Sequence, residues 1–439
     1  MFTAWMQKTT LAIDFGTSNS LVGAYRPISE SNFERIEALK LDPAAKDPSL
    51  MRTLLYFQDA NTCFYGSEAV HKFIENDMEG RLFRSFKSQL PNKNYLGSTI
   101  GNRILPLENM IGIFLLELKH RSEKILGTPA KRAVIGRPAR YAMDDVADGF
   151  ALHRMKKAAD FAGFEDVLFL PEPLAAALEF RRQLKEEKIV LICDFGGGTS
   201  DFTLMRMTPQ PFQKKDVLAI EGCPLSGDAL ESVLMSHRLN ENFGAKAKYR
   251  LPMSSNLLTM PKSVMECLNK PSHIAHLKEP ATYHFIKEVQ KCAPKDKDKE
   301  SIERLFILME DQQIFPFFEK IEQTKRQLSD SDQAHFSFDY PGVEIEDDFS
   351  RQDFEHWSQS IKTEIFKALD LCLQNAQIQA KDVDQVFLTG GTAYVPFIRQ
   401  ELEQRFGLSK LSTKSFFHSV LSGLIESAKD WDLLQEMLG

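Results

Sequence analysis

The sequence predicts an α/β protein built from two similar lobes. Three observations carry this prediction. A glycine-rich turn between two apolar strands occurs twice, at residues 14–18 and at residues 194–201. Strand-like and helix-like stretches alternate along the chain. With 439 residues, the chain is longer than one typical domain, and a repeated unit indicates a duplicated lobe.

Composition limits the class of protein and its partners. Hydrophobic residues make up 43% of the chain and charged residues 26%, which is typical of a globular protein with substantial cores. The formal net charge of −7 provides no general attraction for nucleic acid or an anionic membrane, so we expect neither as a partner. The sequence predicts no membrane span and no secretory signal. The six cysteines form no CxxC pair, which favours reduced thiols and a cytoplasmic location.

Residues 1–187 are predicted to form lobe I. Its first element is a strand–turn–strand hairpin at residues 11–25. The later elements follow the hydrophobic periodicity: strand segments at 54–65, helix 66–80, helix 110–126, strand 133–136, a helix that ends near Gly163, strand 167–170 and helix 174–184. Pro138 ends the strand at 133–136, because proline has no N–H group to donate to a sheet.

Residues 188–415 are predicted to form lobe II, and residues 416–439 a C-terminal helix that packs back on lobe I. Lobe II opens with the second hairpin. Prolines and a charge run at 295–300 mark the region that follows, so we predict an enlarged helical subdomain at about 228–328 with an exposed, solvated loop. The other elements expected after the hairpin are helices 228–243, 321–328, 357–373, 395–406 and 420–438 and strand 386–388.

Both turns have the residue types of a phosphate-binding site. Glycines let the backbone approach an anion closely and offer its N–H groups to phosphate oxygens. Asp14 and Asp194 occupy matching positions, where carboxylates can hold Mg²⁺ through its waters and orient an attacking water. The backbone amides and hydroxyls expected at phosphate are those of Gly16, Thr17, Ser18, Gly196, Gly197, Gly198 and Thr199. For one turn alone, the alternative is an aspartate that merely caps the turn, but the duplication favours phosphate binding.

With these turns in place, the chain resembles the Hsp70-type nucleotide-binding (ATPase) domain of the actin-like ATPase superfamily. In that family the turns read DLGTTNS and DLGGGTFD, which residues 14–20 and 194–201 match. Further family segments are matched in the same order, at residues 133–138, 162–178, 322–329 and 388–396. The resemblance covers nearly the whole chain. It implies the two-lobed actin-like fold, a duplicated ribonuclease H-like fold, with ATP or ADP and Mg²⁺ as ligands.

The resemblance also implies catalytic and metal-binding roles. Asp14, Asp194 and Asp201 would surround Mg²⁺ and its waters. Glu172, in the segment at 162–178, would help to place the attacking water. Thr199 would contact the terminal phosphate.

Lys87 is the remaining catalytic candidate. It stands where the family has a lysine close to the γ-phosphate, within the short match Phe86 to Leu90. Arg84 and Lys93 are local alternatives, and an isolated lysine is normally a surface charge. In phosphoryl transfer, positioning and charge stabilisation supply most of the rate, so a lysine at this place would neutralise developing negative charge.

A second set of residues would bracket the ribose and adenine. The resemblance assigns this role to Glu322, Lys325, Arg326 and Ser329, which share one face of a helix, and to Gly227, Gly390, Gly391, Thr392 and Tyr394. Tyr394 replaces a family arginine, and its ring can stack on the base instead. Phe417 replaces an aspartate expected near the nucleotide. The alternative for the helix, a plain salt-bridged surface, is disfavoured by the order of the motifs.

These features predict an Hsp70-like, Mg²⁺-dependent ATP-binding protein that hydrolyses ATP slowly to ADP and phosphate. Its nucleotide state would control binding to a protein partner or co-chaperone, and we expect no peptide-binding domain in the chain. One alternative is a regulatory or scaffold protein that binds nucleotide with negligible hydrolysis. A small-molecule kinase of the same superfold is less favoured, because the sequence shows no base for a substrate hydroxyl. There is no Walker A motif and no protein-kinase catalytic loop.

Overall fold

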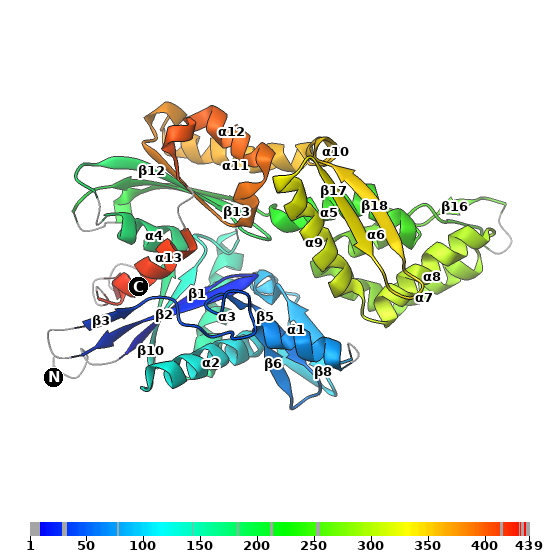
Figure 1. Ribbon diagram of the computed structural model, residues 1–439, viewed down its shortest axis with the longest axis horizontal. Coiled ribbons are helices and arrows are strands. Elements are labelled where there is room, and N and C mark those ends of the chain that lie inside the picture. Colours follow the sequence, from blue (N-terminus) through cyan, green and yellow to red (C-terminus); the bar gives the residue numbers. More distant parts are fainter. Residues whose placement is uncertain are drawn as a thin grey trace. The chain divides into compact units, whose positions relative to one another are not determined.

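The structure is a computed structural model, and it describes residues 9–28, 33–76, 79–142, 144–181, 184–210, 214–251, 255–412, 416–429, 431 and 434–435 (Figure 1). Its mixed sheets and helices confirm the predicted α/β class. Contacts divide the chain into two compact units. Unit 1 consists of Met1–Cys223, Lys367–Gly390 and Leu402–Gly439, and unit 2 of Pro224–Phe366 and Gly391–Glu401. Both glycine-rich turns fall in unit 1, and the lobe boundary at residue 188 stays a prediction.

The first sheet of unit 1 has the strand order β11-β10-β1-β2-β3, and β4 pairs with β2. β1 is antiparallel to β2 and parallel to β10. Every residue of β1 is buried, because strands flank it on both sides and its apolar side chains join the core. The strands are β1 (Thr10–Phe15), β2 (Asn19–Pro27), β3 (Phe33–Ile36), β4 (Met51–Arg52), β10 (Arg132–Arg137) and β11 (Asp166–Pro171).

The second sheet of unit 1 repeats this arrangement. Its order is β14-β13-β12-β19-β20, with β12 antiparallel to β13 and parallel to β19. The strands are β12 (Lys188–Phe195), β13 (Ser200–Met207), β14 (Val217–Cys223), β19 (Gln385–Thr389) and β20 (Leu411–Ser412). β1 and β12 therefore hold equivalent places, and the two glycine-rich turns are the tips of equivalent hairpins.

Helices cover the first sheet and fix where its strands end. α2 (Leu107–Leu126) and α3 (Asp145–Phe161) contribute side chains to the same core as β1. The Asp144 carboxylate accepts a hydrogen bond from the Ala147 N–H group and so caps α3.

α4 (Glu172–Arg181) and α13 (Phe416–Ser427) lie side by side (Figure 1). They touch through backbone, because a Cβ atom on Gly423 would lie 1.8 Å from the Ala175 carbonyl oxygen. The C-terminal segment therefore contains a helix, as predicted, but α13 ends at Ser427 and not near residue 438, and residues 430, 432–433 and 436–439 lie outside the described part of the chain. α13 packs against α4, β1, β2 and β10.

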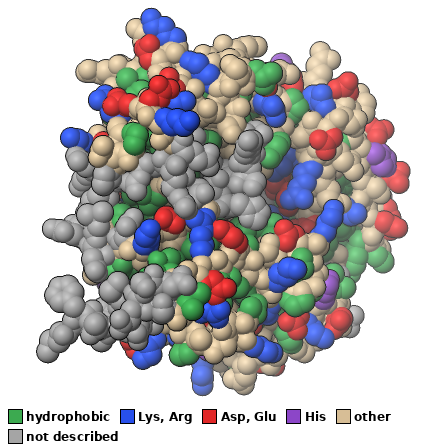
Figure 2. Space-filling model, turned by 60° about the vertical axis from the view of Figure 1, so that its left-hand side comes forward, with side chains coloured by type: hydrophobic (Ala, Val, Ile, Leu, Met, Phe, Trp, Pro, Cys, Tyr) green, Lys and Arg blue, Asp and Glu red, His purple; other side chains and the backbone are tan. Residues whose placement is uncertain are grey.

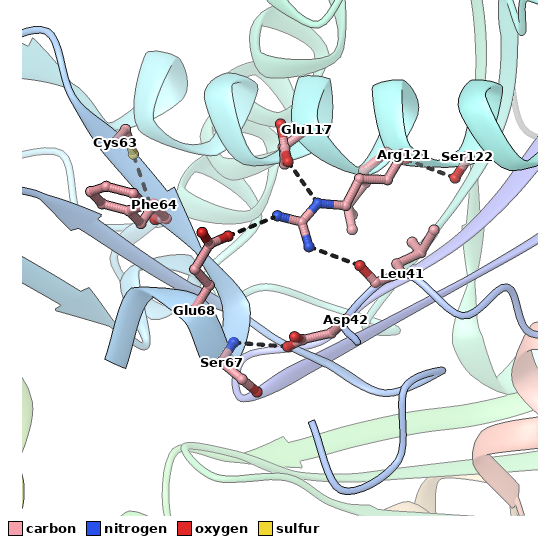
Figure 3. A network of polar contacts seen from close by, with 10 residues as sticks. Leu41, Asp42, Cys63, Phe64, Ser67, Glu68, Glu117, Arg121 and Ser122 are labelled. Carbon is pink, nitrogen blue, oxygen red and sulfur yellow. Dashed lines mark hydrogen bonds and ion pairs between the residues drawn. The ribbon is translucent and has the colours of Figure 1, made fainter. Parts of the chain in front are cut away.

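A group of smaller elements in unit 1 carries Lys87 and a polar network (Figure 3). In this network, the Asp42 carboxylate accepts from the Ser67 N–H group at 2.8 Å, and Arg121 donates to the Leu41 carbonyl at 2.8 Å and to Glu117 at 2.6 Å. These contacts join the segment before β4 to α1 and α2. The elements are β5 (Leu54–Phe57), β6 (Cys63–Tyr65), α1 (Gly66–Glu75), β7 (Arg81–Arg84), the 3₁₀ helix η2 (Phe86–Gln89), β8 (Gly97–Ile100) and β9 (Arg103–Pro106).

Unit 2 is mostly helical, with two short hairpins. An aromatic cluster forms its core, in which the Phe317 ring meets those of Phe243, Phe336 and Phe338 with centroids 5.0–5.2 Å apart. The main elements are α5 (Gly227–His237), β15 (Lys248–Tyr249), β16 (Leu258–Thr259), α6 (Lys262–Asn269), α7 (Pro280–Lys291), α8 (Asp296–Glu310), α9 (Ile314–Asp330), β17 (Gln333–Phe338), β18 (Ile345–Ser350) and α10 (Arg351–Trp357). Helices α11 (Gln359–Asn375) and α12 (Pro396–Phe406) contain residues of both units.

The charge run at 295–300 is solvated as predicted, but it is not a loop. Residues from Asp296 onward form the first turns of α8. Asp296 and Asp298 favour this helical start, because acidic side chains in a first turn interact well with the helix dipole.

The surface and the helices agree with the class inferred from composition. On the face shown in Figure 2, basic and acidic side chains are intermixed, without a large area of one sign. Among the residues described, no helix combines the length and the apolar character that crossing a bilayer requires.

The contact between α4 and α13 generates a stability prediction. The substitution Gly423→Ala forces the two backbones apart and should lower the free energy of unfolding by about 1–3 kcal/mol. Gly149→Ala is the matched control, since a Cβ atom there meets nothing within 4 Å; it should stabilise the chain by up to about 1 kcal/mol. Urea unfolding midpoints measure both effects. An unchanged midpoint for Gly423→Ala would contradict the close packing.

Candidate functional site

The tips of the two equivalent hairpins in unit 1 bring the predicted aspartates into electrostatic reach. Asp14 is the penultimate residue of β1 and is only 7% exposed. Burial raises the pKa of Asp14 to about 8, helped by repulsion from Glu172 and opposed by Lys87. Burial also raises the pKa of Asp194, at the end of β12, well above its usual value, with repulsion from Glu172, Asp201 and Asp14.

Asp201 completes the acidic group from the other strand of the second hairpin. Burial raises its pKa to about 7, while a hydrogen bond from the Thr199 hydroxyl, 2.8 Å from Oδ2, works against this shift. Four carboxyl groups, those of Asp14, Glu172, Asp194 and Asp201, therefore crowd a site with one neighbouring ammonium group, that of Lys87. Such a concentration of acidic groups, three of them with raised pKa values, is typical of a functional site that receives a cation.

Lys87 lies in η2 and points into this site. Its side chain is buried, its ammonium group donates to the Phe15 carbonyl, and Nζ lies 3.7 Å from Glu172 Oε1. The ammonium group also lies 5.4 Å from the centre of the Phe15 ring. Lys87 is therefore no ordinary surface lysine, whereas Lys93, one of its local alternatives, is exposed.

Glu172 begins α4 directly after the end of β11. Its Oε1 atom is buried and, within the described part of the chain, accepts no hydrogen bond. Buried carboxylate oxygens normally have a donor, so this atom is a place for a water or ligand proton. A Cβ atom on Gly136 would lie 3.3 Å from Cγ of Glu172. A glycine in β10, which sequence analysis did not single out, therefore makes room for the carboxylate.

The first turn is held by a residue that sequence analysis also missed. The Thr53 hydroxyl donates to the Gly16 carbonyl at 2.8 Å, and the Thr53 N–H group donates to the Ser18 carbonyl at 2.9 Å. A Cβ atom on Gly16 would lie 2.2 Å from the Asn19 carbonyl oxygen, so the fold itself requires this glycine. Thr17 is half-buried, and Ser18 is exposed.

The second turn leaves open space beside its backbone. The Gly196 N–H group donates to the Thr199 carbonyl at 2.9 Å and closes the turn. A Cβ atom on Gly198 would meet nothing within 4 Å, so the protein's own packing does not explain this glycine. Close approach of a ligand to the backbone does explain it. Gly197 between them is half-buried.

The loop after β19 contains one structural and one unexplained glycine. Gly390 has φ +82°, and a Cβ atom there would lie 1.9 Å from the Phe195 carbonyl oxygen, so the fold requires it. Gly391 has open space around its Cβ position. Thr392 is buried, and Tyr394 is 56% exposed.

Most residues assigned to adenosine lie in unit 2, four of them on α9, whereas Gly390 belongs to unit 1. Lys325 Nζ donates to the buried Glu231 carboxylate at 2.6 Å and to the Gly227 carbonyl at 3.4 Å. Glu322 and Arg326 form an ion pair, and the Ser329 hydroxyl donates to the Lys325 carbonyl at 3.3 Å. The Lys325 ammonium group is thus engaged by the protein itself. Glu231 was not among the residues singled out from the sequence. Its carboxylate pairs with Lys325, which explains why a lysine stands at this position.

The acidic group fits a hydrated metal ion better than a directly ligated one. Within the described ranges, no three His, Cys, Asp or Glu side chains are placed to ligate one metal ion. Mg²⁺ keeps several of its waters and takes few protein ligands, so it needs no such cluster. With their raised pKa values, Asp14, Asp194 and Asp201 hold protons more readily than ordinary aspartates, and a divalent cation would replace those protons and balance the negative charge of the ionised side chains. The donor set therefore fits Mg²⁺ held largely through water.

The raised pKa values generate a prediction on stability. The folded chain keeps protons on Asp14 up to about pH 8 and on Asp201 up to about pH 7, whereas the ordinary pKa is 3.8. Between these values the folded chain binds more protons than the unfolded chain, so the stability of the ligand-free protein falls as pH rises. Melting temperatures measured from about pH 5 to about pH 8.5 should decrease, and Asp14→Asn should flatten the decrease. The exposed Asp160→Asn is the control; parallel curves for all three proteins would refute the assignment.

Comparison with known proteins places the chain in a family. A family model described as "Hsp70 protein" matches residues 62–269 and 290–416, which is well over half of the chain. The chain is 25% identical over 402 residues to "Chaperone protein DnaK" of Thermosipho melanesiensis and 24% identical over 407 residues to that of Thermosipho africanus. In both cases the match covers 90% of this chain and 55% of the relative, so the chain spans about half the length of the curated relatives it matches.

The family match confirms the resemblance inferred from the two turns, and with it the two-lobed actin-like ATPase fold. The chain belongs to the Hsp70 family.

Proposed function

We propose that the chain binds ATP with Mg²⁺, hydrolyses it slowly to ADP and phosphate, and uses its nucleotide state to control binding to a protein partner or co-chaperone in the cytoplasm. The observation that carries this proposal is the group of four carboxylates beside Lys87 at the tips of two equivalent hairpins. Family membership supports nucleotide binding, and the geometry supports a phosphate end of the site in unit 1.

In this proposal the chain's own residues bind and orient the reactants. Asp14, Asp194 and Asp201 would hold Mg²⁺ through its waters, and the bound ion would balance negative charge on the carboxylates and phosphates. Oε1 of Glu172, which accepts no hydrogen bond within the described residues, accepts one from the attacking water and orients it. Lys87 supplies positive charge for the terminal phosphate.

The second turn supplies the neutral donors. The N–H groups of Gly197 and Gly198 and the Thr199 hydroxyl donate to phosphate oxygens, and the open space beside Gly198 admits a phosphate. The first turn donates to phosphate oxygens in the same way, through Gly16, Thr17 and Ser18. In the second turn, the Gly196 N–H group is already used to close the turn.

The adenosine contacts rest on the resemblance, which assigns residues that lie mostly in unit 2. Because Lys325 is bound to Glu231, its main role is to order the side of α9 that faces the nucleotide, and its own contact with the nucleotide is secondary. Glu322, Arg326 and Ser329 then present polar groups to the ribose and base. Gly227, Gly390, Gly391 and Thr392 shape the loops, and the exposed ring of Tyr394 stacks on adenine.

The role of Lys87 has a sharp test. Lys87→Ala should lower the single-turnover rate of ATP hydrolysis by about a hundredfold, because a buried charge beside the terminal phosphate is lost. Lys93→Ala removes an exposed lysine six residues away and should leave the rate unchanged. Asp194→Asn should also abolish most of the activity. Equal hydrolysis by the wild type and Asp194→Asn would count decisively against the assigned site.

The same measurement separates the alternatives. Binding of Mg²⁺ and ATP by calorimetry without single-turnover hydrolysis would identify a regulatory or scaffold protein. Phosphate transfer that occurs only with an added hydroxyl acceptor would identify a kinase.

Tyr394 generates a prediction on base preference. Tyr394→Ala should weaken ATP binding by about 1–3 kcal/mol, because an aromatic ring that stacks on the base is lost, whereas Tyr394→Phe should retain affinity. Calorimetric dissociation constants for both variants decide the point. If Tyr394→Ala binds ATP as tightly as the wild type, the ring does not contact the base.

A further inference from the structure

We propose that Arg154 is a positioning residue for Lys87: its guanidinium group fixes the turn that aims the lysine at Glu172. The inference deepens the proposed function and rests on it for the role of Lys87 in hydrolysis. The structural half of the inference, that Arg154 keeps the turn in position, rests on contacts within unit 1.

The turn that carries Lys87 has little support of its own. η2 is a single turn of four residues, Phe86–Gln89, and such a short helix is not stable in isolation. Ser85, which precedes it, has φ +54°, a left-handed conformation that is uncommon outside glycine. Its internal bonds run from the Ser88 N–H and hydroxyl groups to the Ser85 carbonyl and from the Leu90 N–H group to the Lys87 carbonyl.

Arg154, on α3, holds the carbonyl groups at the end of this turn and just beyond it. One terminal nitrogen donates to the carbonyl oxygens of Gln89, Leu90 and Asn92, at 3.3, 3.5 and 3.2 Å. The other donates to the Tyr95 carbonyl at 2.6 Å. Carbonyl groups at a helix end lack partners within the helix, and a cation there also interacts well with the helix dipole. The planar, five-donor guanidinium group suits this task, which a lysine cannot match.

The environment of Arg154 keeps the guanidinium group in one place. The residue is 4% exposed, its Nε lies 3.6 Å from the Glu108 carboxylate of α2, and its guanidinium carbon lies 4.6 Å from the centre of the Phe150 ring. The charge is therefore balanced, and the donors are directed at the backbone of residues 89–95. This arrangement suits a side chain whose role is to hold a backbone segment in position.

The opposite end of the turn is held by aromatic packing. The buried Phe86 ring lies 6.4 Å from that of Phe15 and 6.2 Å from that of Phe114. Because the turn is held on both sides, the Lys87 side chain is directed at the Phe15 carbonyl and Glu172. Loss of Arg154 frees one side, and misplacement of a catalytic group by about 1 Å can cost a factor of about 100 in rate.

A double-mutant cycle tests the inference on the full chain. Arg154→Met keeps length but loses the donors; it should lower the single-turnover hydrolysis rate about tenfold or more, while the ATP dissociation constant changes by less than about threefold. In a Lys87→Ala background, Arg154→Met should cause no further loss, because it acts through the missing lysine. Arg154→Lys, with fewer donors, should lie between wild type and Arg154→Met. Equal loss in both backgrounds would overturn the inference.

Arg121→Met is the matched control. Arg121 also donates to a backbone carbonyl and pairs with glutamate, but its partners are Leu41, Glu68 and Glu117 (Figure 3). It lies about 20 Å along α2 from Glu108, by the helical rise per residue. Its hydrolysis rate should match the wild type.

Hydrogen exchange of the nucleotide-free protein supplies a readout that does not need hydrolysis. Arg154→Met should accelerate exchange in peptides that cover residues 86–95, and Arg121→Met should not. If the wild type fails to hydrolyse ATP but this acceleration occurs, the proposed function falls and the hold on the turn stands. If the wild type hydrolyses ATP while Arg154→Met retains normal rate and protection, the inference falls and the function stands. Should Arg154→Met not fold, the same comparisons with Arg154→Lys decide.

Discussion

The burial of several acidic side chains close to one another is the constraint on which the site depends. Burial raises the pKa values of Asp14, Asp194 and Asp201, nearby carboxylates raise them further, and Lys87 opposes these shifts. Burying like charges is unfavourable unless a cation or protons balance them. The fold maintains this arrangement at a cost in stability, which is typical of a functional site and is accounted for by a divalent cation.

Ordinary packing holds the four carboxylates in place. Each of the two equivalent hairpins has an aspartate one residue before the end of its first strand, and β11 leads directly into Glu172 at the start of α4. α4 is in turn fixed by backbone contact with α13 at Gly423. Thr53 and Arg154 hold the turns from outside. The site is therefore built on strand ends, and the helices and turns around it restrict where each charge can go.

Repeated motifs and hydrophobic periodicity allowed part of the fold to be predicted from the sequence. The two turns, the α/β class and the buried run of β1 follow from short local patterns, and so does the helix at the C-terminal segment. The contacts of Thr53, Gly136 and Arg154 could not be predicted, because each joins residues far apart in the chain by geometry that leaves no pattern in the sequence. The prediction of a loop at 295–300 is wrong, because α8 begins there. A charge run indicates solvent exposure but does not distinguish an exposed loop from the exposed start of a helix.

Calorimetry of preformed magnesium–ATP binding at pH 7.5, repeated in buffers of different ionisation enthalpy, tests the central claim most directly. Binding of the cation should ionise Asp14 and Asp201, whose pKa values of about 8 and about 7 leave them partly protonated before binding. We expect tight binding with release of a measurable fraction of a proton, and loss of most of that release in Asp14→Asn. Absence of binding, or binding with no proton release, would contradict it.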